Sequence, residues 1–342
     1  MFSRQSLEAL SDILSDDYFG PLLHTLVLGT DHLTTDLPLK DPVPFEMQME
    51  APAPCEGLNI DTTKYRTYLA DQNNLLSSGL AVAYLSSIFS KAKNCKTLII
   101  DDDHRAWGAN FLKRETGVHP TTTLDSLESQ DFIASAFQTI LIALTASGLR
   151  IETFQVYAGC VTVPINPEIL SPCPVLRLSP LPFATSLTNL ALAVDSGDNY
   201  ALDSETWPST LTQFIHRFPR LEKLELTFES RVESRSFHKI SQALSLPCLQ
   251  TLTLSVIDCT EDDLSWIFQK HRKSLQDINL DTVNIIQKGG TWNSLLATIR
   301  SQMQLRRLSI ENCFQDEEDI IVHGNEMIPS STSLQCRRHF RP

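Results

Sequence analysis

The sequence predicts an α/β solenoid built from leucine-rich repeats, curved, with short parallel strands on its concave face and helices on its convex face. Three observations support this fold class. A six-residue pattern, apolar-x-x-apolar-x-apolar, recurs along the chain, and apolar positions at helical spacing separate the copies. Neither kind of segment can bury its apolar face alone, so each must stack against neighbouring copies, as in a solenoid.

The strand pattern is clearest in the C-terminal half. Five copies begin there, at Leu187, Leu221, Leu249, Leu275 and Leu305. Their spacing is close to the roughly 20 to 29 residues of leucine-rich repeats. Three weaker copies lie upstream, at Leu23, Cys95 and Ile151. A single copy is common by chance in a leucine-rich chain, but five in succession predict a repeat array.

The segments between the copies predict helices. Apolar residues at spacings of three and four fall within residues 207–218, 237–244, 264–271 and 292–299. The same period holds upstream over residues 132–144, where Gly148 is placed to end the helix, and more weakly over residues 80–88 and 7–14. A helix followed by a short strand is therefore the expected repeating unit.

We expect one repeat domain over residues 1–314, regular only from about Leu187 onward. Two proline-rich insertions interrupt it, at about residues 31–60 and 160–186. The first is expected to be a mobile loop and the second to pack on the solenoid. Residues 315–342 form either a cap on the last repeat or a disordered tail.

Composition limits the classes of function. The formal net charge is −13, and basic residues form only short clusters, so nucleic acid is not an expected partner. The chain starts without a secretory signal, and its longest apolar stretch is too short to cross a membrane, so we expect no membrane partner. Eight cysteines without CxxC pairs indicate buried thiols in a reducing compartment, cytoplasmic or nuclear.

The sequence contains no recognisable catalytic or metal-binding motif. The run from Asp101 to His104 follows a predicted strand and could attract a divalent cation. It lacks the glycine and distal glutamate of a calcium loop, however, and is better interpreted as a solvated strand end. No cysteine and histidine lie at zinc-ligand spacing, and no nucleophile, phosphate-loop or dinucleotide fingerprint occurs. We therefore expect no enzyme, no metal and no cofactor.

The best candidate site is the concave face. Side chains alternate along a strand, so the residues between the buried leucines must share the opposite face. The predicted protein-binding residues are Lys223, Glu225, Thr251, Thr253, Asp277, Asn279, Asp281, Arg307 and Glu311. Their acids would suit a partner that carries basic groups. The alternative is that this polar face is only solvated, because exposed strand positions are polar regardless of function.

The segment SLEALSDILSDDYFGPLLHTLVLG, from Ser6 to Gly29, resembles the segment that follows the F-box in fungal F-box/leucine-rich-repeat proteins. The repeats FPRLEKLELTF, LPCLQTLTLSV and HRKSLQDINLDTVNI are similar to those of the same group. Cys313 occupies the Asn/Cys position of the repeat consensus, while Ile257 and Val283 stand at the equivalent positions of two other copies. The resemblance implies a substrate-recognition module of an SCF-type ubiquitin ligase.

The resemblance covers the repeat region and not the F-box, because no such three-helix module precedes Ser6 in this sequence. We expect either a gene that starts further upstream, a paralogue without the module, or an unrelated repeat protein. A different class of function, activation of a small GTPase, is suggested by the acidic run Asp316 to Asp319. It would need an arginine or asparagine at the strand ends, which the sequence does not identify. A decayed paralogue without a partner is the third alternative.

Overall fold

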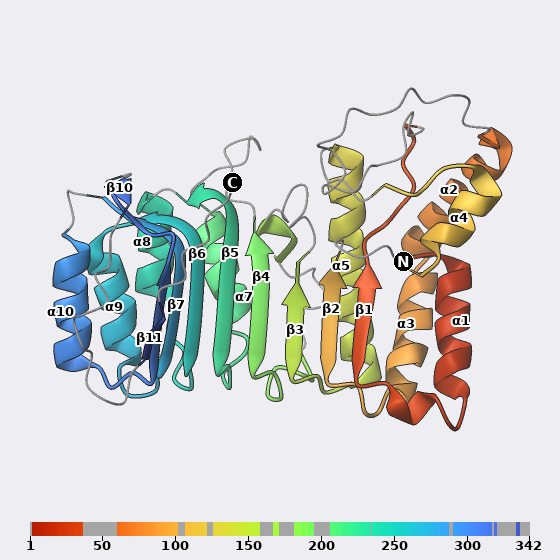
Figure 1. Cartoon of the computed structure of the whole chain (residues 1–342). Helices are drawn as coiled ribbons and strands as arrows, with labels where there is room; N and C mark the ends of the chain where they lie inside the picture. Colours follow the sequence, from red (N-terminus) through yellow and green to blue (C-terminus); the bar gives the residue numbers. More distant parts are fainter. Residues whose placement is uncertain are drawn as a thin grey trace. The chain divides into compact units, whose positions relative to one another are not determined.

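The computed structural model describes residues 2–36, 60–101, 107–121, 126–157, 167–170, 181–194, 206–232, 234–286, 290–316, 318–319 and 333–335. The chain divides into two compact units (Figure 1). Unit 1 is Met1–Ile165 with Pro172–Phe183, and unit 2 is Asn166–Ser171 with Ala184–Pro342. The single predicted repeat domain and its second insertion therefore extend over both units, whereas the first insertion lies in unit 1.

Unit 1 repeats a helix followed by a strand. Its helices are α1 (Arg4–Ser15), α2 (Thr62–Ser77), α3 (Leu80–Lys91), α4 (Ala109–Thr116) and α5 (Leu127–Ser147). Its strands are β1 (Thr25–Gly29), β2 (Thr97–Asp101) and β3 (Thr153–Val156), after a short 3-10 helix at Gly20–Leu22. The strands pair in parallel in the order β1-β2-β3, and α1, α3 and α5 precede them in turn. The three weak copies of the strand pattern are thus strands.

Helices α2 and α4 form an additional layer in unit 1 that the sequence did not predict. They enclose a small apolar cluster made by Leu33, Tyr65, Leu112 and Val118. The backbone of His32 pairs with Thr121 in an isolated antiparallel bridge beside this cluster. Ser3, Asp61 and Ser126 cap the amino ends of α1, α2 and α5 with their side chains, which satisfies backbone N–H groups in the first turns.

Unit 2 continues the same alternation more regularly. Its strands are β4 (Asn189–Val194), β5 (Lys223–Val232), β6 (Thr251–Cys259), β7 (Asp277–Ile285) and β8 (Arg307–Glu311). Its helices are α7 (Trp207–Ile215), α8 (Ser234–Ala243), α9 (Glu261–His271) and α10 (Trp292–Gln302), with a 3-10 helix, η3, at Pro167–Leu170. Short strands β9 (Phe314–Gln315), β10 (Glu318–Asp319) and β11 (Ser333–Gln335) follow. Figure 1 shows α7 to α10 in a row on one side of the strands.

A backbone ladder holds the repeats of unit 2 in register at the point where each strand begins. The N–H groups of Gln250 and Thr251 both donate to the carbonyl oxygen of Glu222, at 2.7 and 2.9 Å. Gln276 and Asp277 donate to Gln250 in the same way, and Arg306 and Arg307 donate to Gln276. Each repeat therefore places the residue before its strand at an equivalent position. The parallel pairs β4-β5, β5-β6, β6-β7 and β7-β8 follow from this alignment.

Three strands bend at an equivalent residue. Val256, Thr282 and Asn312 have φ angles of 63°, 55° and 49°, in the left-handed region. The chain then continues into a second row of pairing, where Asp258 lies opposite Asn284, which in turn lies opposite Phe314. The Asn284 side chain donates to Asp258 at 3.0 Å across this row and is buried. A β-branched valine in this conformation is strained.

The core of unit 2 lies between the strands and the helix row. The predicted inward positions are buried, including Leu224, Leu252 and Leu280, and the three predicted Asn/Cys positions Ile257, Val283 and Cys313 are buried beside them. The α/β class, with parallel strands alternating with helices, is confirmed. The expectation that the cysteines are buried is confirmed for Cys95, Cys259 and Cys313, but it is wrong for Cys248, which is exposed on the turn between α8 and β6.

Several sequence predictions fall outside the described residues. These are most of the two proline-rich insertions, and all of the C-terminal tail except β9, Asp316, β10 and β11. Within the tail, the backbone of β11 pairs in parallel with β8, and β10 pairs with β9. No helix among the described residues is long and apolar enough to cross a bilayer.

Candidate functional site

The predicted binding residues form three rows across β5 to β8 of unit 2. The first row is Lys223, Thr251, Asp277 and Arg307. The second row is Glu225, Thr253, Asn279 and Ser309. The third row is Thr227, Ser255, Asp281 and Glu311. Each residue alternates with the buried leucine or isoleucine of its strand, so all three rows lie on the face away from the core. We call this surface the strand face.

Exposure differs along the rows. Lys223 and Arg307 at the ends of the first row are exposed, whereas Glu225, Thr253, Asn279, Asp281 and Glu311 are half-buried. Asp277, Ser255 and Ser309 are buried, contrary to the expectation that strand positions facing away from the core are exposed. The open part of the strand face is therefore smaller than the sequence pattern indicated.

The burial of Asp277 has a specific cause. Arg306, the residue before β8, donates from Nε to Asp277 Oδ1 at 3.1 Å and from a terminal nitrogen to Oδ2. This two-pronged ion pair raises the pKa of Arg306, through the hydrogen bond first and the charge second. Asp277 was expected to act as an open acid toward a partner. The structure corrects this expectation, because its carboxylate is occupied by a neighbouring arginine.

The remaining acids form one local pair. Asp281 on β7 and Glu311 on β8 are direct cross-strand partners in the third row. Asp281 Oδ1 accepts from Asn312 Nδ2 at 2.9 Å, and Glu311 Oε1 accepts from the Ser309 hydroxyl at 3.0 Å. No basic side chain takes part in these hydrogen bonds, and like charges opposite one another repel. Glu225 lies on β5, two strands from Asp281, so the predicted four-acid cluster is not one cluster.

The second row contains a cross-strand contact. Asn279 Nδ2 donates to the Thr253 hydroxyl at 3.1 Å, which links β7 to β6 on the strand face. Thr251 stands one row below Thr253 on the same strand, beside Lys223 of β5. The centre of the strand face is thus neutral and polar, with a basic first row at its outer strands and an acid pair in the third row.

No family model and no curated protein matches the chain. Three other polar groupings compete with the strand face: a histidine and carboxylate pair on the helix row, a buried histidine in unit 1, and the acidic end of β2.

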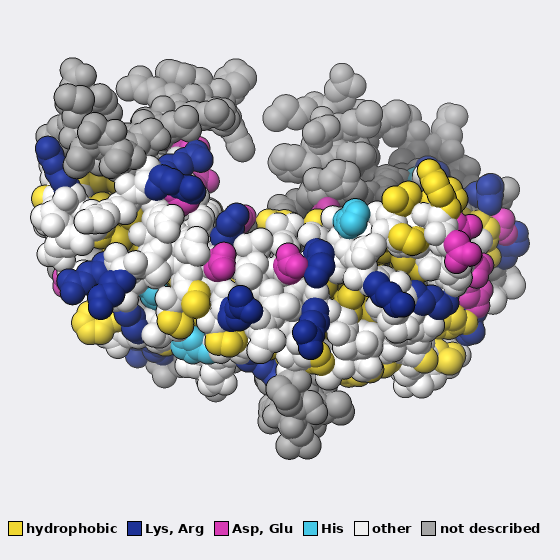
Figure 2. All heavy atoms as spheres, turned by 90° about the horizontal axis from the view of Figure 1, so that it is seen from below, with side chains coloured by type: hydrophobic (Ala, Val, Ile, Leu, Met, Phe, Trp, Pro, Cys, Tyr) yellow, Lys and Arg dark blue, Asp and Glu magenta, His cyan; other side chains and the backbone are white. Residues whose placement is uncertain are grey.

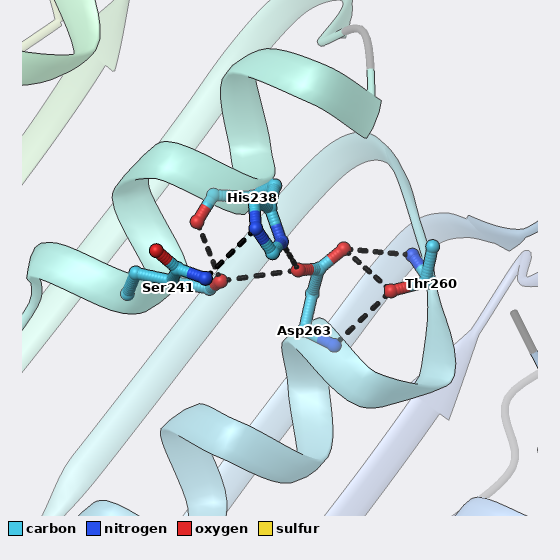
Figure 3. A network of polar contacts seen from close by, with 5 residues as sticks. His238, Ser241, Thr260 and Asp263 are labelled. Carbon is cyan, nitrogen blue, oxygen red and sulfur yellow. Dashed lines mark hydrogen bonds and ion pairs between the residues drawn. The ribbon is translucent and has the colours of Figure 1, made fainter.

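Figure 3 shows the first grouping, in which His238 and Ser241 of α8 point toward Asp263 of α9. His238 Nδ1 lies 2.6 Å from Asp263 Oδ1, and the Ser241 hydroxyl donates to the same oxygen at 3.2 Å. The other carboxylate oxygen accepts from the Thr260 backbone N–H and hydroxyl, at 3.0 and 2.7 Å. Histidine, carboxylate and serine therefore meet, as they do in a catalytic triad.

The order of contacts differs from that of a triad, however. A nucleophilic serine must bond the far ring nitrogen of the histidine so that the imidazole can take its proton. Here Ser241 bonds the carboxylate, and His238 Nε2 lies 2.8 Å from the side-chain nitrogen of Gln242. Thr260 and Asp263 form a capping box at the start of α9. We interpret the grouping as a brace that joins α8 to the amino end of α9.

The second grouping surrounds His32 in unit 1, directly after β1. Its Nδ1 lies 2.9 Å from the Thr30 carbonyl and its Nε2 lies 2.8 Å from the Ser129 hydroxyl. The ring stacks on Phe132 at 4.4 Å between centroids. Burial lowers the pKa of His32 to about 4, so the imidazole is neutral at pH 7. His32 and Ser129 have no exposed surface, which leaves no room for a substrate at the serine.

The third grouping is the predicted solvated strand end. Asp101 is the last residue of β2 and its carbonyl accepts from the Thr30 N–H at 3.3 Å. Asp102, Asp103 and His104 lie outside the described residues. Within the described part of the chain, no group of three or more histidine, cysteine, aspartate or glutamate side chains could hold a metal ion.

Sequence reasoning missed one set of residues beside the strand face. The prediction included Arg307 but not Arg306, and it omitted Arg220, Arg272 and Lys273 on the turns that lead into β5 and β7. A signal for them was present, because Arg220, Arg272 and Lys273 precede an identified strand pattern by one to three residues and Arg306 is the second residue of another. The prediction considered only positions inside the strands, whereas the backbone ladder aligns the residues before them as well.

Proposed function

We propose that the chain is a leucine-rich-repeat scaffold that binds a protein partner on the strand face of unit 2. The observation that carries the proposal is the register of β5 to β8, which arranges the polar side chains of four successive repeats in rows. A parallel sheet is normally covered by helices on both faces. In unit 2 the helices α7 to α10 stand on one side only (Figure 1), which favours a binding role for the other side.

The chemistry of the rows favours a partner with a basic side chain near one end of the contact. Asp281 and Glu311 repel each other, so a lysine or arginine placed between them would relieve that repulsion and gain two charged hydrogen bonds. The neutral second row, with Thr253 and Asn279, would accept backbone or amide groups of the same partner. Such an interface gains specificity mainly from charge placement.

Site-specific photo-cross-linking tests this assignment. A photoreactive amino acid replaces Thr253 on the strand face in one version of the chain, and Gln269 on the exposed side of α9 in a second version. Both are irradiated in an extract of the cells that produce the protein. We expect a discrete protein adduct from position 253 and none of the same mass from position 269. An adduct from position 269 alone would place the partner on the helix row and contradict the proposal.

A charge reversal in the acid pair, Asp281 and Glu311, is a second test of the proposed interface. Glu311→Lys should reduce the yield of the adduct from position 253 several-fold, because it replaces the expected attraction by repulsion. The matched control is Asp17→Lys, which makes the same change of charge at an exposed position of unit 1. An equal reduction by both variants would show a general effect of charge and remove the acid pair from the interface.

We further propose, on the resemblance to fungal F-box proteins, that the bound partner is a substrate of an SCF-type ubiquitin ligase. The test is co-purification of the tagged endogenous protein with the ligase adaptor that docks F-boxes. Recovery of the adaptor would support the ligase role. Recovery of the cross-linked partner without the adaptor would remove that role and leave the protein-binding proposal intact.

A further inference from the structure

Basic side chains gather where the chain of unit 2 enters three of its strands. We call the set the basic rim: Arg220, Lys223, Arg272, Lys273, Arg306 and Arg307. All six are exposed. The acidic residues in the same three strand entries are Glu222 and Asp277, and Asp277 is buried beneath Arg306. Figure 2 looks at the amino ends of the strands and shows Lys and Arg side chains spread along this side, with Asp or Glu side chains beside them near the middle and at the right end.

The backbone ladder aligns Lys223, Arg306 and Arg307 of the basic rim, and Arg220, Arg272 and Lys273 lie two to four residues before the aligned positions. Glu222, Gln250, Gln276 and Arg306 occupy equivalent positions in four successive repeats, linked by hydrogen bonds of 2.7 to 2.8 Å. Neighbouring strands lie about 4.8 Å apart, so the distance from the entry of β5 to that of β8 is roughly 14 Å. The turn into β6, between them, carries no charged side chain from Leu244 to Gln250. The cations therefore line one edge, with a neutral gap.

Most of these cations have no internal partner. Among the described residues, no ion pair involves Arg220, Lys223, Arg272 or Lys273. Three exposed cations elsewhere are in ion pairs, Arg4 with Asp71, Lys64 with Glu115 and Lys96 with Glu152, whereas others, such as Arg66 and Lys93, are single exposed cations. The end of α9 attracts Arg272 and Lys273 through its helix dipole. That dipole does not explain the strand residues Lys223 and Arg307, so helix capping alone does not account for the rim.

We propose that the basic rim binds an acidic, extended segment of a protein partner. In an extended peptide, side chains on one side recur about every 6.6 Å, so three alternate carboxylates would cover a rim of about 14 Å. Arginine is suited to this ligand because its fork holds a carboxylate at two points. Arg306 already makes that contact with Asp277, so the forks of Arg220 and Arg272 are the ones that would hold the peptide.

A peptide suits the rim better than a nucleic acid does. The chain carries a formal net charge of −13, which repels a polyanion at a distance and more strongly as its length grows. Single strands are usually held by aromatic side chains on which the bases stack. The six rim residues include none. A short acidic segment needs only the local field of the rim.

The test is a titration of a fluorescently labelled hexaglutamate peptide with the full chain, followed by anisotropy. We expect saturable binding at low salt that weakens as the salt rises to roughly 0.5 M, because exposed charges are screened. Arg272→Glu should weaken binding by about tenfold, since it removes a cation and adds an anion at the rim. Arg66→Glu, the same change at an exposed position on α2, should weaken it less than twofold.

Three outcomes would overturn the proposal. These are no binding of hexaglutamate at low salt, equal losses in Arg272→Glu and Arg66→Glu, or tighter binding of a six-nucleotide thymidine strand than of the peptide. The rim and the strand face can also be separated. Arg272→Glu should leave the cross-linked adduct from position 253 unchanged, whereas Glu311→Lys should leave hexaglutamate affinity unreduced. The failure of either proposal is thus distinguishable from the failure of the other.

Discussion

At the scale of single residues, the most constrained polar side chain is the imidazole of His32. One ring nitrogen donates a hydrogen bond to the Thr30 carbonyl oxygen. The other ring nitrogen therefore accepts a hydrogen bond from the Ser129 hydroxyl. The backbone of His32 also exchanges hydrogen bonds with Thr121, at 3.0 and 2.7 Å. A neutral ring satisfies this arrangement, whereas a protonated ring would place a positive charge out of contact with water. Burial is the main cause of the lowered pKa.

This residue predicts an acid-sensitive stability. The pKa of His32 is about 4 in the folded chain and near 6.5 when exposed, so unfolding favours proton uptake between these values. The stabilisation is complete above pH 6.5 and decreases as the pH falls toward 4, by roughly 3 kcal/mol in total. The measurement is the free energy of unfolding in urea at pH 7 and pH 4.5, for the wild type and His32→Gln.

His32→Gln should lower stability at pH 7 but should show a shallower loss between pH 7 and pH 4.5 than the wild type. The control is His24→Gln, at an exposed histidine just before β1, which should keep the wild-type slope. Identical slopes in the wild type and His32→Gln would show that another group controls the acid response. His216 and His271, whose pKa values burial also lowers, would then be examined.

At the scale of elements, the bend after the strand face determines where each repeat turns back to its helix. Val256 in β6, Thr282 in β7 and Asn312 directly after β8 adopt the left-handed conformation at equivalent positions. Asparagine tolerates this conformation because its short polar side chain can bond locally, whereas valine places two branches against the backbone. The same turn is therefore made by one suited residue, Asn312, and by two β-branched residues, Val256 and Thr282.

Val256→Asn should stabilise the chain by about 1 kcal/mol, because a left-handed residue with a branched Cβ costs roughly that amount. The matched control is Val27→Asn on β1, where the backbone is regular and the side chain is half exposed. That change should destabilise the chain by up to about 1 kcal/mol, since valine is favoured in strands. Thermal unfolding of the wild type, Val256→Asn and Val27→Asn measures whether each substitution raises or lowers the stability of the chain. A loss of stability in Val256→Asn would contradict the expected strain.

The same elements show what the sequence could predict. The alternation of apolar residues in each strand and helix follows directly from burial, so strands at Leu224 and helices such as α9 were predicted within a few residues. The bend at Val256 was not predictable, because valine is typical of a continuing strand. Helices α2 and α4 were also missed, since their apolar residues complete a separate small cluster around Tyr65 rather than the repeat.

The candidate site was predictable to a similar extent. Alternation alone placed Thr253, Asn279 and their neighbours in rows, and the parallel register confirmed that placement. Alternation could not indicate that Arg306 covers Asp277, because that contact depends on a long side chain reaching across from the next repeat. The brace between His238 and Asp263 was missed for the same reason, since the two residues lie on different helices.

At the scale of whole units, the hydrogen-bonded strands of unit 2 form a linear array. From β4 to β8, consecutive strands pair with one another, and the helix row follows the same order. Stability in such an array is approximately a sum of contributions from each repeat and from its contacts with adjacent repeats. A destabilising substitution in one repeat should therefore lower the stability of adjacent repeats most and of distant repeats least. In a globular core the loss would be shared by the whole core.

Leu280→Ala tests this on β7, near one end of the array. Leu280 is 1% exposed on β7, so its truncation should cost about 2 to 5 kcal/mol and leave a cavity between the strands and helices. Amide hydrogen exchange followed by mass spectrometry should show the largest loss of protection in β6, β7 and β8, a smaller loss in β5 and the smallest in β4. The control is Leu192→Ala on β4, at the equivalent row position three pairings away, for which the gradient should reverse. A uniform loss across β4 to β8 in both variants would show that unit 2 opens as one cooperative body, because the cost would then be shared by every repeat regardless of its distance from the cavity.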